Sequence, residues 1–439
     1  MLTAFVRAFQ TPDLRKKILI TLGLIALFRF GASLPTPGVD VKNVTYCSGL
    51  ATATGSSTAN VLAIVNLLSG QALLRLSVFA LGIMPYITSS IILQLLTVVI
   101  PRLETLKQEG QAGQAKITQY TRYLTVGLAI LQSTGIVALA RSGNLFQGAC
   151  NQSLIPDDSI FTISTMVITM TAGTAVIMWL GELITDRGVG NGMSILIFTQ
   201  VIAVIPGEMQ NIYKTRHGFV FAVVLAVGVA IVAFVVFMEQ AQRRIPVQYA
   251  KRMVGRKMYG GTSTYIPLKV NQAGVIPVIF ASSLLYIPQL ASTIFGSRTH
   301  PQGWVTWINT YMVRGDSAIY MLSFFVLIIF FTYFYVAITF NPTEVADNMK
   351  KYGGFIPGIR PGRPTSEYLN YVLTRLTAPG SIYLGTIALI PMIALALVGA
   401  TQNFPFGGTS ILIAVGVGLD TVKQIESQLQ QRNYEGFLR

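Results

Sequence analysis

Residues 82–90 read GIMPYITSS, and residues 274–283 read GVIPVIFASS. Both stretches follow the pattern glycine, aliphatic residue, apolar residue, proline, any residue, isoleucine. A second pair is formed by GMSILI at 192–197 and GTSILI at 408–413, which share the run Ser-Ile-Leu-Ile. Either match alone can arise by chance in isoleucine-rich helices. Together they pair two regions of the first half of the chain with two of the second half in the same order, which indicates an internal duplication.

The composition indicates a membrane protein. The chain has 439 residues, of which 52% are hydrophobic and only 11% are charged, and its mean hydropathy is +0.58. A soluble protein carries about 25% charged residues. We therefore expect an all-α polytopic membrane protein with ten transmembrane helices. The predicted spans are 18–34, 75–100, 121–140, 160–181, 191–206, 218–238, 273–295, 317–340, 378–399 and 409–425.

The duplication divides the ten spans into two units of five, at residues 1–210 and 211–439. Because five is odd, the two units must cross the membrane in opposite senses, as inverted repeats. Pro85 and Pro277 lie at equivalent positions, where each is expected to remove a helix hydrogen bond and permit a bend. In proteins of this kind the working site lies between the two halves.

The positive charges predict the orientation. The chain has a net charge of +15 and 32 lysine and arginine residues. If the N-terminus is cytoplasmic, the external loops hold only Lys42, Arg141, Lys214, Arg216, Arg298 and Arg314. Loops rich in lysine and arginine stay in the cytoplasm, so both termini are expected there.

Two long cytoplasmic loops, at 240–272 and 341–376, hold more positive charge than orientation requires. The basic residues singled out are Arg243, Arg244, Lys251, Arg252, Arg256, Lys257 and Arg360. One interpretation is contact with anionic lipid headgroups. The other is docking of a large acidic partner, such as ribosomal RNA or a motor ATPase. Glycine and proline residues predict structured projections rather than tails, which favours docking.

The sequence offers little for chemistry at the centre of the membrane. Its two histidines, His217 and His300, fall in predicted external loops, and no aspartate or glutamate lies deep in a predicted span. We therefore expect no cofactor, no metal and no enzyme activity. A passive channel is favoured, and a secondary transporter of a small solute built on an inverted repeat is the alternative. Ion-coupled transporters usually bury an ionisable residue for coupling, which argues against that alternative.

Six stretches resemble one protein family. They are FALGIMPYI at 79–87, GNGMSILIF at 190–198, QRRIPVQYAKRMVGR at 242–256, LKVNQAGVIPVIFASS at 268–283, GGFIPGIRPGRPT at 353–365 and FGGTSILI at 406–413. These stretches are similar to the SecY family, the channel subunits of the bacterial Sec protein translocon. The resemblance covers essentially the whole chain, and the wording of 260–283 is most similar to actinobacterial members.

The resemblance implies a function and a set of partners. The expected function is a central protein-conducting channel that passes unfolded secretory proteins across the plasma membrane and inserts membrane proteins laterally into it. The expected partners are the SecE and SecG subunits, the SecA ATPase, the ribosome and its targeting receptor, a YidC-type insertase, signal peptides and nascent chains, and anionic lipids.

The resemblance also implies a ring of aliphatic side chains that closes the pore at mid-membrane. Carried over residue by residue, the ring consists of Ile83, Ile87, Met193, Ile197, Ile279 and Ile413. Ile87 and Ile279 occupy matching places in the duplicated motifs, and so do Ile197 and Ile413. A narrow apolar constriction excludes ions by dewetting and offers no hydrogen bond to a passing polypeptide.

The resemblance further implies that the short apolar segment at 59–70 folds back as a plug helix below the ring. About eleven helical residues cover only half of a bilayer core. The alternative is a helix lying in the membrane interface. The plug residues singled out are Asn60, Val61, Leu62, Ile64, Val65, Asn66, Leu68, Ser69 and Gly70.

The family architecture also implies a lateral gate, a seam between spans two and three on one side and seven and eight on the other. Four polar residues match positions near this seam, namely Thr88, Gln94, Gln132 and Asn271. There they would set the equilibrium between closed and open states. The alternative is that they act only as interhelical contacts, worth about 1 kcal/mol each.

The chain has two cysteines, Cys47 and Cys150, and both fall in predicted external loops. Disulfides persist in such an oxidising compartment. We therefore predict a Cys47–Cys150 disulfide, which would limit the movement of the plug segment. The alternatives are two free thiols or cross-links to other chains.

Overall fold

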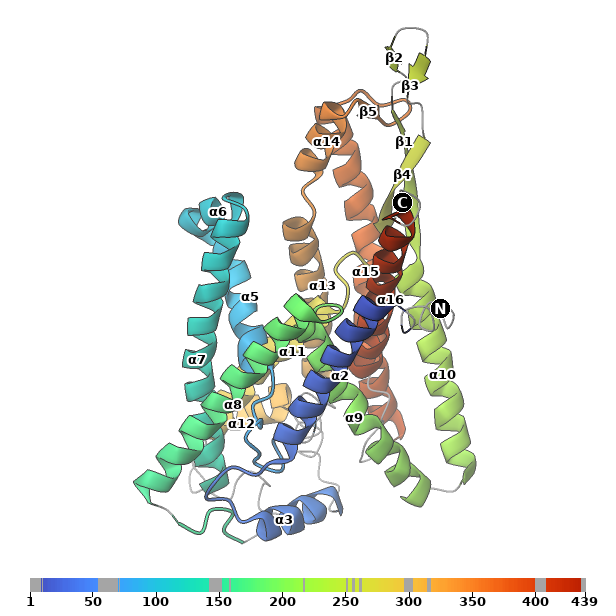
Figure 1. Cartoon of the computed structure of the whole chain (residues 1–439). Coiled ribbons are helices and arrows are strands. Elements are labelled where there is room, and N and C mark those ends of the chain that lie inside the picture. The colour runs from blue at the N-terminus through green and yellow to red at the C-terminus, as the bar shows by residue number, and fades with distance from the viewer. Residues whose placement is uncertain are drawn as a thin grey trace.

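The computed structural model describes residues 9, 11–53, 70, 72–141, 152–157, 159–215, 218–249, 252–254, 257–259, 263–295, 303–313, 317–398 and 408–435. Figure 1 shows an elongated, mostly helical molecule. A small sheet lies at one end of the molecule, and helix α3 (Val41–Ala53) lies at the opposite end.

A helix overlaps each of the ten predicted spans. These helices are α2 (Pro12–Ser33), α5 (Met84–Val99), α7 (Gln111–Arg141), α8 (Ile160–Arg187), α9 (Gly192–Thr215), α10 (Gly218–Gln240), α11 (Ile276–Phe295), α13 (Ala318–Thr339), α15 (Arg363–Val398) and α16 (Gly408–Glu435). The shorter ones are α3, α6 (Pro101–Gln108), α12 (Gly303–Ile308), a π-helical turn at Asn309–Val313 and α14 (Pro342–Lys351).

Several of these helices are long and apolar enough to cross a membrane. Among the described residues, four helices pass this test, in α7, α8, α10 and α13. The count rises to five if α5 and α6, which meet at a bend of 105°, form one span. The apolar parts of α9 and α11 are shorter, at 192–207 and 276–285. The fold is therefore helical with several apolar helices, and the number ten stays a prediction.

The predicted span at 75–100 is helical only from Met84 onward, so its first part is wrong. Residues 72–83 form consecutive turns that pair with the chain after α2. Thr36 donates a backbone hydrogen bond to the Leu76 carbonyl at 3.0 Å, and Val78 donates one to Leu34 at 2.9 Å. Residues 75–83 are apolar because most of them are buried in the core, although they are not helical. Hydropathy alone cannot distinguish a buried turn segment from a membrane helix.

The two repeated prolines begin helices instead of bending them. Pro85 is the second residue of α5 and Pro277 is the second residue of α11. Proline costs no hydrogen bond in the first turn, so the predicted bends at these residues are wrong. Three residues before each proline, Gly82 and Gly274 have positive φ angles of 57° and 62°. The duplicated motif thus adopts the same local conformation in both halves.

The second duplicated motif also matches at the backbone level. Helix α9 begins at Gly192 and helix α16 begins at Gly408, the first residues of GMSILI and GTSILI. Both duplicated motifs therefore have matching local backbone structure, and the inverted repeat of two five-helix units stays a prediction.

The two basic loops form one structured projection. Strand β1 (Gln242–Tyr249) pairs antiparallel with β4 (Ser263–Lys269) from the same loop and with β5 (Gly354–Phe355) from the other loop. The short strands β2 (Arg252–Val254) and β3 (Lys257–Tyr259) pair with each other beyond the sheet. The sheet rests on α14 and α15 through a small core of its own that includes Ile245, Leu268, Met349, Ile356 and Leu369.

Candidate functional site

The six predicted ring residues all belong to, or pack against, one large hydrophobic cluster. Ile83, Ile197, Ile279 and Ile413 are buried, and Ile87 and Met193 are half-buried and pack against the same cluster. They come from four separate parts of the chain: the start of α5, α9, α11 and α16. Four helix ends that are far apart in sequence therefore contribute aliphatic side chains to one apolar region.

The start of α9 is fixed tightly against α8, which positions Met193. The Asn191 side chain caps α9 by accepting hydrogen bonds from the backbone N–H groups of Met193 and Ser194 at 3.1 and 3.3 Å. A Cβ placed on Gly181 would lie 2.5 Å from Met193 Sδ. The Thr185 hydroxyl accepts a hydrogen bond from Gly192 N–H and donates one to the Gly181 carbonyl, both at 2.9 Å. Helices α8 and α9 can approach this closely only because both contact positions are glycine.

The isoleucines near the repeated prolines are positioned by the helix starts. Ile87 donates its backbone N–H to the Ile83 carbonyl at 3.1 Å, so these two residues are one turn apart on the same face. Ile279 follows Pro277 by two residues, as Ile87 follows Pro85. The equivalence seen in the sequence thus extends to the local geometry around the ring residues.

A weakly packed seam separates two helix pairs. Helix α5 packs along α7, and α11 packs along α13, whereas contacts across from α5 and α7 to α11 are sparse. Thr88 donates its hydroxyl to the Met84 carbonyl, and Gln94 donates to the Ser90 hydroxyl, so both bond within α5. Gln132 is half-buried on α7. Among the described residues, neither Thr88 nor Gln94 forms a side-chain hydrogen bond across the seam to α11 or α13.

Asn271 lies in the turn before α11 and joins it to α10. Its side-chain Nδ2 donates to Glu239 Oε1 at 2.5 Å and to the Gly274 carbonyl at 3.2 Å. Glu239 is only 7% exposed, so its carboxylate is buried although it lies next to the last residue of α10. Sequence reasoning missed this pair because its members are 32 residues apart in different elements.

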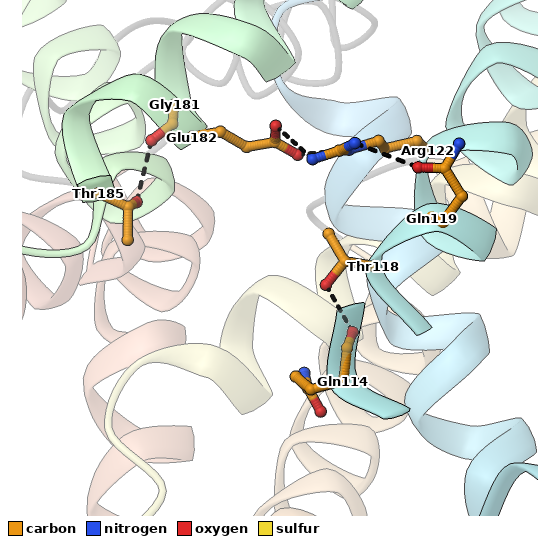
Figure 2. A network of polar contacts seen from close by, with 7 residues as sticks. All are labelled: Gln114, Thr118, Gln119, Arg122, Gly181, Glu182 and Thr185. Atoms are coloured by element: carbon orange, nitrogen blue, oxygen red, sulfur yellow. Dashed lines mark hydrogen bonds and ion pairs between the residues drawn. The ribbon is translucent and has the colours of Figure 1, made fainter. Parts of the chain in front are cut away.

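Figure 2 shows a polar network between α7 and α8 that sequence reasoning also missed. Arg122 Nε and Nη2 donate to Glu182 Oε1 and Oε2, both at 2.8 Å, in a two-pronged ion pair. Arg122 Nη1 also donates to Gln119 Oε1 at 3.1 Å. A signal was available in the sequence: Arg122 lies at the start of the predicted span 121–140, and Glu182 directly follows the end of the next span, 160–181, so the two opposite charges are expected on the same side of the membrane. The pair ties α7, which borders the seam, to α8, which supports the start of α9.

The basic residues of the first loop lie along the sheet and its hairpin. Arg243 and Arg244 are exposed on β1, and the Arg244 guanidinium lies 4.8 Å from the centre of the Tyr265 ring. Arg252 and Lys257 belong to β2 and β3. Lys251 and Arg256 lie outside the described residues.

Arg360 is exposed on a turn that is fixed by its neighbours. Gly358 and Gly362, two residues on either side, have φ angles of 84° and 106°, which favour glycine. The Thr365 hydroxyl donates to the Arg360 carbonyl at 2.9 Å. The turn therefore presents the guanidinium on a rigid backbone.

Of the predicted plug residues, Asn60, Val61, Leu62, Ile64, Val65, Asn66, Leu68 and Ser69 lie outside the described residues. Gly70 is described and buried, and its carbonyl accepts a hydrogen bond from Arg29 Nη1 of α2 at 3.3 Å.

Cys47 is fully buried on α3 and takes part in a disulfide bond. Cys150, the other cysteine of the chain, lies outside the described residues. The surroundings of Cys47 include the segment just after Cys150, since Asn43 Nδ2 donates to the Ser153 carbonyl at 3.0 Å. Asp40 N–H also donates to the Leu154 carbonyl, at 3.1 Å.

The described residues contain no group of three or more histidine, cysteine, aspartate or glutamate side chains that could hold a metal ion. The site consists instead of an apolar centre, a seam, polar contacts at helix ends and an exposed basic projection.

Comparison with known proteins gives consistent matches. The SecY family model matches residues 77–422. The chain is 67% identical to the protein translocase subunit SecY of Streptomyces galbus, with 100% of both chains covered. It is also similar to a solved SecY structure concerned with the plug domain and the closed state of the translocation channel, with 18% identity and a TM-score of 0.63 over 94% of this chain and 92% of that one. Sec61 in the canine ribosome–channel complex gives 16% identity and a TM-score of 0.57 over the same shares.

Proposed function

The chain belongs to the SecY family and is a protein-conducting channel subunit of a protein translocase, not an enzyme; we propose that its conducting path runs between the two halves and is closed by the six ring residues. The observation that supports this proposal is that the six residues belong to, or pack against, one hydrophobic cluster: Ile83, Ile87, Met193, Ile197, Ile279 and Ile413. The relatives are translocase subunits, which supports the channel and not the small-solute transporter.

An aliphatic ring suits the task of a channel for unfolded protein. A translocating polypeptide presents every kind of side chain, so the constriction must hold none of them. Isoleucine and methionine side chains form no strong hydrogen bonds, and the flexible methionine side chain can adapt to different widths. When no polypeptide is present, the closed apolar ring excludes water and therefore ions.

We propose that the chain crosses the bacterial plasma membrane ten times, with both termini in the cytoplasm. Its N-terminal half, 1–210, contains spans one to five and the plug helix, and its C-terminal half, 211–439, contains spans six to ten and the two docking loops. The matched backbone geometry at Gly82 and Gly274 supports this division. The distribution of lysine and arginine supports the orientation.

We propose that the seam between α5 and α7 on one side and α11 and α13 on the other is the lateral gate. Tight packing within each helix pair and sparse contact between the pairs support this role, because the seam can then part without unpacking either pair. Thr88, Gln94, Gln132 and Asn271 are proposed to set the gate equilibrium. Signal peptides and nascent membrane helices would leave through this seam.

The sheet of β4, β1 and β5 with its basic side chains is the proposed docking surface for the SecA ATPase and the ribosome. Two observations support this docking role: β5 pairs with β1 and so joins the two loops, and Arg360 lies on a turn fixed by the Thr365 hydrogen bond. The similar Sec61 structure comes from a ribosome–channel complex, which supports the ribosome as a partner. SecE, SecG, the targeting receptor, a YidC-type insertase and anionic lipids complete the proposed set of partners.

We propose that residues 59–70 form the plug and that Cys47 pairs with Cys150. The solved SecY structure concerned with a plug domain supports the first part. The disulfide at Cys47 and the hydrogen bonds of Asp40 and Asn43 to residues 153–154 support the second, because the chain has only two cysteines.

Reconstitution tests the proposed function directly. The full chain is placed in proteoliposomes with SecE, SecG and SecA, and a secretory protein with an intact signal sequence is offered together with ATP. We expect ATP-dependent protection of the secretory protein from external protease. Failure to translocate any such protein, when the complex is assembled, would contradict the proposal.

A further inference from the structure

The segments before the two repeated proline motifs make the same backbone contact in both halves. In the first half, Val78 N–H donates at 2.9 Å to the carbonyl of Leu34, the residue directly after α2. In the second half, Val270 N–H donates at 3.0 Å to the carbonyl of Ala241, the residue directly after α10. Both valines lie four residues before the glycine that begins the repeated motif. Each half therefore ties the start of its motif to the end of its first long helix.

The carbonyl of the same valine faces a glycine in both halves. A Cβ placed on Gly173 of α8 would lie 2.1 Å from the Val78 carbonyl oxygen. A Cβ placed on Gly380 of α15 would lie 2.4 Å from the Val270 carbonyl oxygen. No larger residue fits at either glycine unless the backbone moves. Three elements thus meet at one joint in each half: the first joint consists of Leu34, Val78 and Gly173, and the second of Ala241, Val270 and Gly380.

The side chains at the two joints are chemically different. In the first joint, the residue after the valine is Phe79, which is 6% exposed and stacks on Phe28 of α2 with 5.9 Å between the ring centres. In the second joint it is Asn271, which is 3% exposed and donates a hydrogen bond to Glu239 of α10. A buried hydrogen bond in the second half therefore takes the place of an aromatic contact in the first.

Asn271 fastens the turn before α11 to α10. Its Nδ2 atom donates both to Glu239 Oε1 and to the carbonyl of Gly274, whose φ angle of 62° belongs to this turn. Glu239 is buried, and within the part of the chain that the structure describes it forms no ion pair. A buried carboxylate or amide that loses its partner keeps the cost of leaving water. The contact therefore holds the turn against α10 strongly.

The second joint lies between the basic sheet and a ring residue. Strand β4 ends at Lys269, directly before the joint, and Lys269 pairs with Gln242, the first residue of β1 (Figure 1). On the other side of the joint, Ile279 lies in the first turn of α11 and donates its backbone N–H to the Val275 carbonyl at 3.4 Å. The turn that Asn271 holds is thus the short connection between the sheet and Ile279.

We propose that Glu239 and Asn271 are positioning residues for the pore ring. Their hydrogen bond fixes the start of α11 against α10 and so holds Ile279 in the ring. This inference rests on the proposed function, since it requires Ile279 to be part of the seal. It differs from a simple packing role because an oxygen acceptor of the right length at position 239 is sufficient, with or without a charge.

The first test is the resting ion conductance of the assembled complex in planar bilayers. Glu239→Ala should raise the leak about tenfold, the order that a lost hydrogen bond to a carboxylate gives. Glu239→Gln keeps an oxygen acceptor for Asn271 and should stay near the unmodified channel. Asn271→Leu leaves the carboxylate unpaired and should also leak. Adding Glu239→Leu to Asn271→Leu should lower that leak, because neither partner is then left unpaired.

Two matched controls separate this from general effects of charge and polarity near the same helix ends. Asp420→Asn removes a carboxylate that forms an exposed ion pair with Lys269. Thr377→Val removes a buried hydroxyl of α15 that donates within its own helix, to the Leu373 carbonyl. Both should leave the leak unchanged. The proposal is overturned if Glu239→Gln leaks as much as Glu239→Ala, or if the double leucine variant leaks more than Asn271→Leu alone.

A second measurement reports the position of α11 directly. Ile279 is 9% exposed, so a single cysteine at position 279, in a channel with Cys47→Ser and Cys150→Ser, should react slowly with a water-soluble maleimide. Asn271→Leu should make this reaction severalfold faster, and Glu239→Gln should not. The measurement with Asn271→Leu decides the question even where Glu239→Ala does not assemble. An unchanged labelling rate with Asn271→Leu would overturn the proposal.

Export of a protein with an intact signal sequence separates failure of this inference from failure of the proposed function. If the unmodified channel exports normally while neither the leak nor the labelling rate responds to Glu239 or Asn271, only the positioning role fails. If the unmodified channel exports nothing, the proposed function itself fails.

Discussion

Arg122 of α7 and Glu182 of α8 form a two-pronged ion pair in which both hydrogen bonds measure 2.8 Å. The pair (Figure 2) is one of the contacts that join α7, a helix at the proposed gate, to α8, the helix that supports Met193; the Ser133 and Thr171 hydroxyls form another. Parallel hydrogen bonds from one guanidinium to one carboxylate fix the relative orientation of two helices better than a single contact does.

A double-mutant cycle with Arg122→Gln and Glu182→Gln should give a coupling energy of about 1 kcal/mol, since the pair is partly solvated. Unfolding of the purified complex by dodecyl sulfate measures it. The Lys269–Asp420 pair is the control, because it has a single contact of 3.4 Å and an aspartate side chain 64% exposed. Its coupling should be close to zero. Equal coupling in the two pairs would remove the structural role given to Arg122.

Replacing Ile279 or Ile413 with asparagine should open the ring to water. Each substitution buries an unpaired amide in the closed state, at a cost of about 1–3 kcal/mol, which corresponds to a rise of about fivefold or more in the open fraction. The resting conductance should rise, and secretory proteins with defective signal sequences should be exported. Ile279→Leu and Ile413→Leu keep the apolar volume and should keep the seal. An unchanged leak in both asparagine variants would exclude these residues from the seal.

Arg360→Glu should abolish SecA-driven export while the channel stays assembled. The turn at Gly358–Gly362 keeps its backbone, so the change reverses one presented charge and little else. Arg363→Glu is a suitable control, because Arg363 belongs to the same loop but pairs with Glu367 on its own helix. Export measured by protease protection should fall to background for the first variant only. Normal export with Arg360→Glu would refute the docking role.

The predicted Cys47–Cys150 disulfide is tested by measuring the mass of the intact protein after alkylation. Intact channel treated with an alkylating reagent should gain no label before reduction and two labels after reduction. Cys47→Ser should leave one reactive thiol, and it should also loosen α3, because Cys47 is buried against Val44 and Leu154. Two labels without reductant would disprove the bond, and one label per chain in a cross-linked dimer would point to pairing between chains.

The sequence predicts residues of the large hydrophobic cluster because the duplicated motifs carry them near the helix starts, and their arrangement as a ring stays a prediction. It fails at residues 75–83, where a pairing between Pro35 and Ser77 replaces helix with turns. That pairing depends on residues 42 positions apart, so no local pattern of hydropathy contains it. The pairing of β5 with β1 could not be predicted for the same reason, because the two strands belong to different loops and lie about 100 residues apart in the sequence.

Polar residues within apolar helices were the least predictable part of the site. Arg29, Gln200 and Glu239 each interrupt or end an apolar stretch of a helix, and a hydropathy pattern does not say what such a residue contacts. Their neighbours come from other elements: Arg29 donates to the Gly70 carbonyl, Gln200 lies beside Gly70, and Glu239 accepts from Asn271. Only the three-dimensional arrangement supplies those partners.

The most direct measurement is cross-linking of a polypeptide arrested during export. In a channel with Cys47→Ser and Cys150→Ser, a single cysteine is placed at position 83, 197 or 413, and the arrested secretory protein carries one cysteine in its translocating part. We expect disulfide cross-links from all three ring positions and none from position 168, where Ile168 is 67% exposed on the outer face of α8. Cross-links from position 168 with none from the ring would show that the polypeptide passes elsewhere.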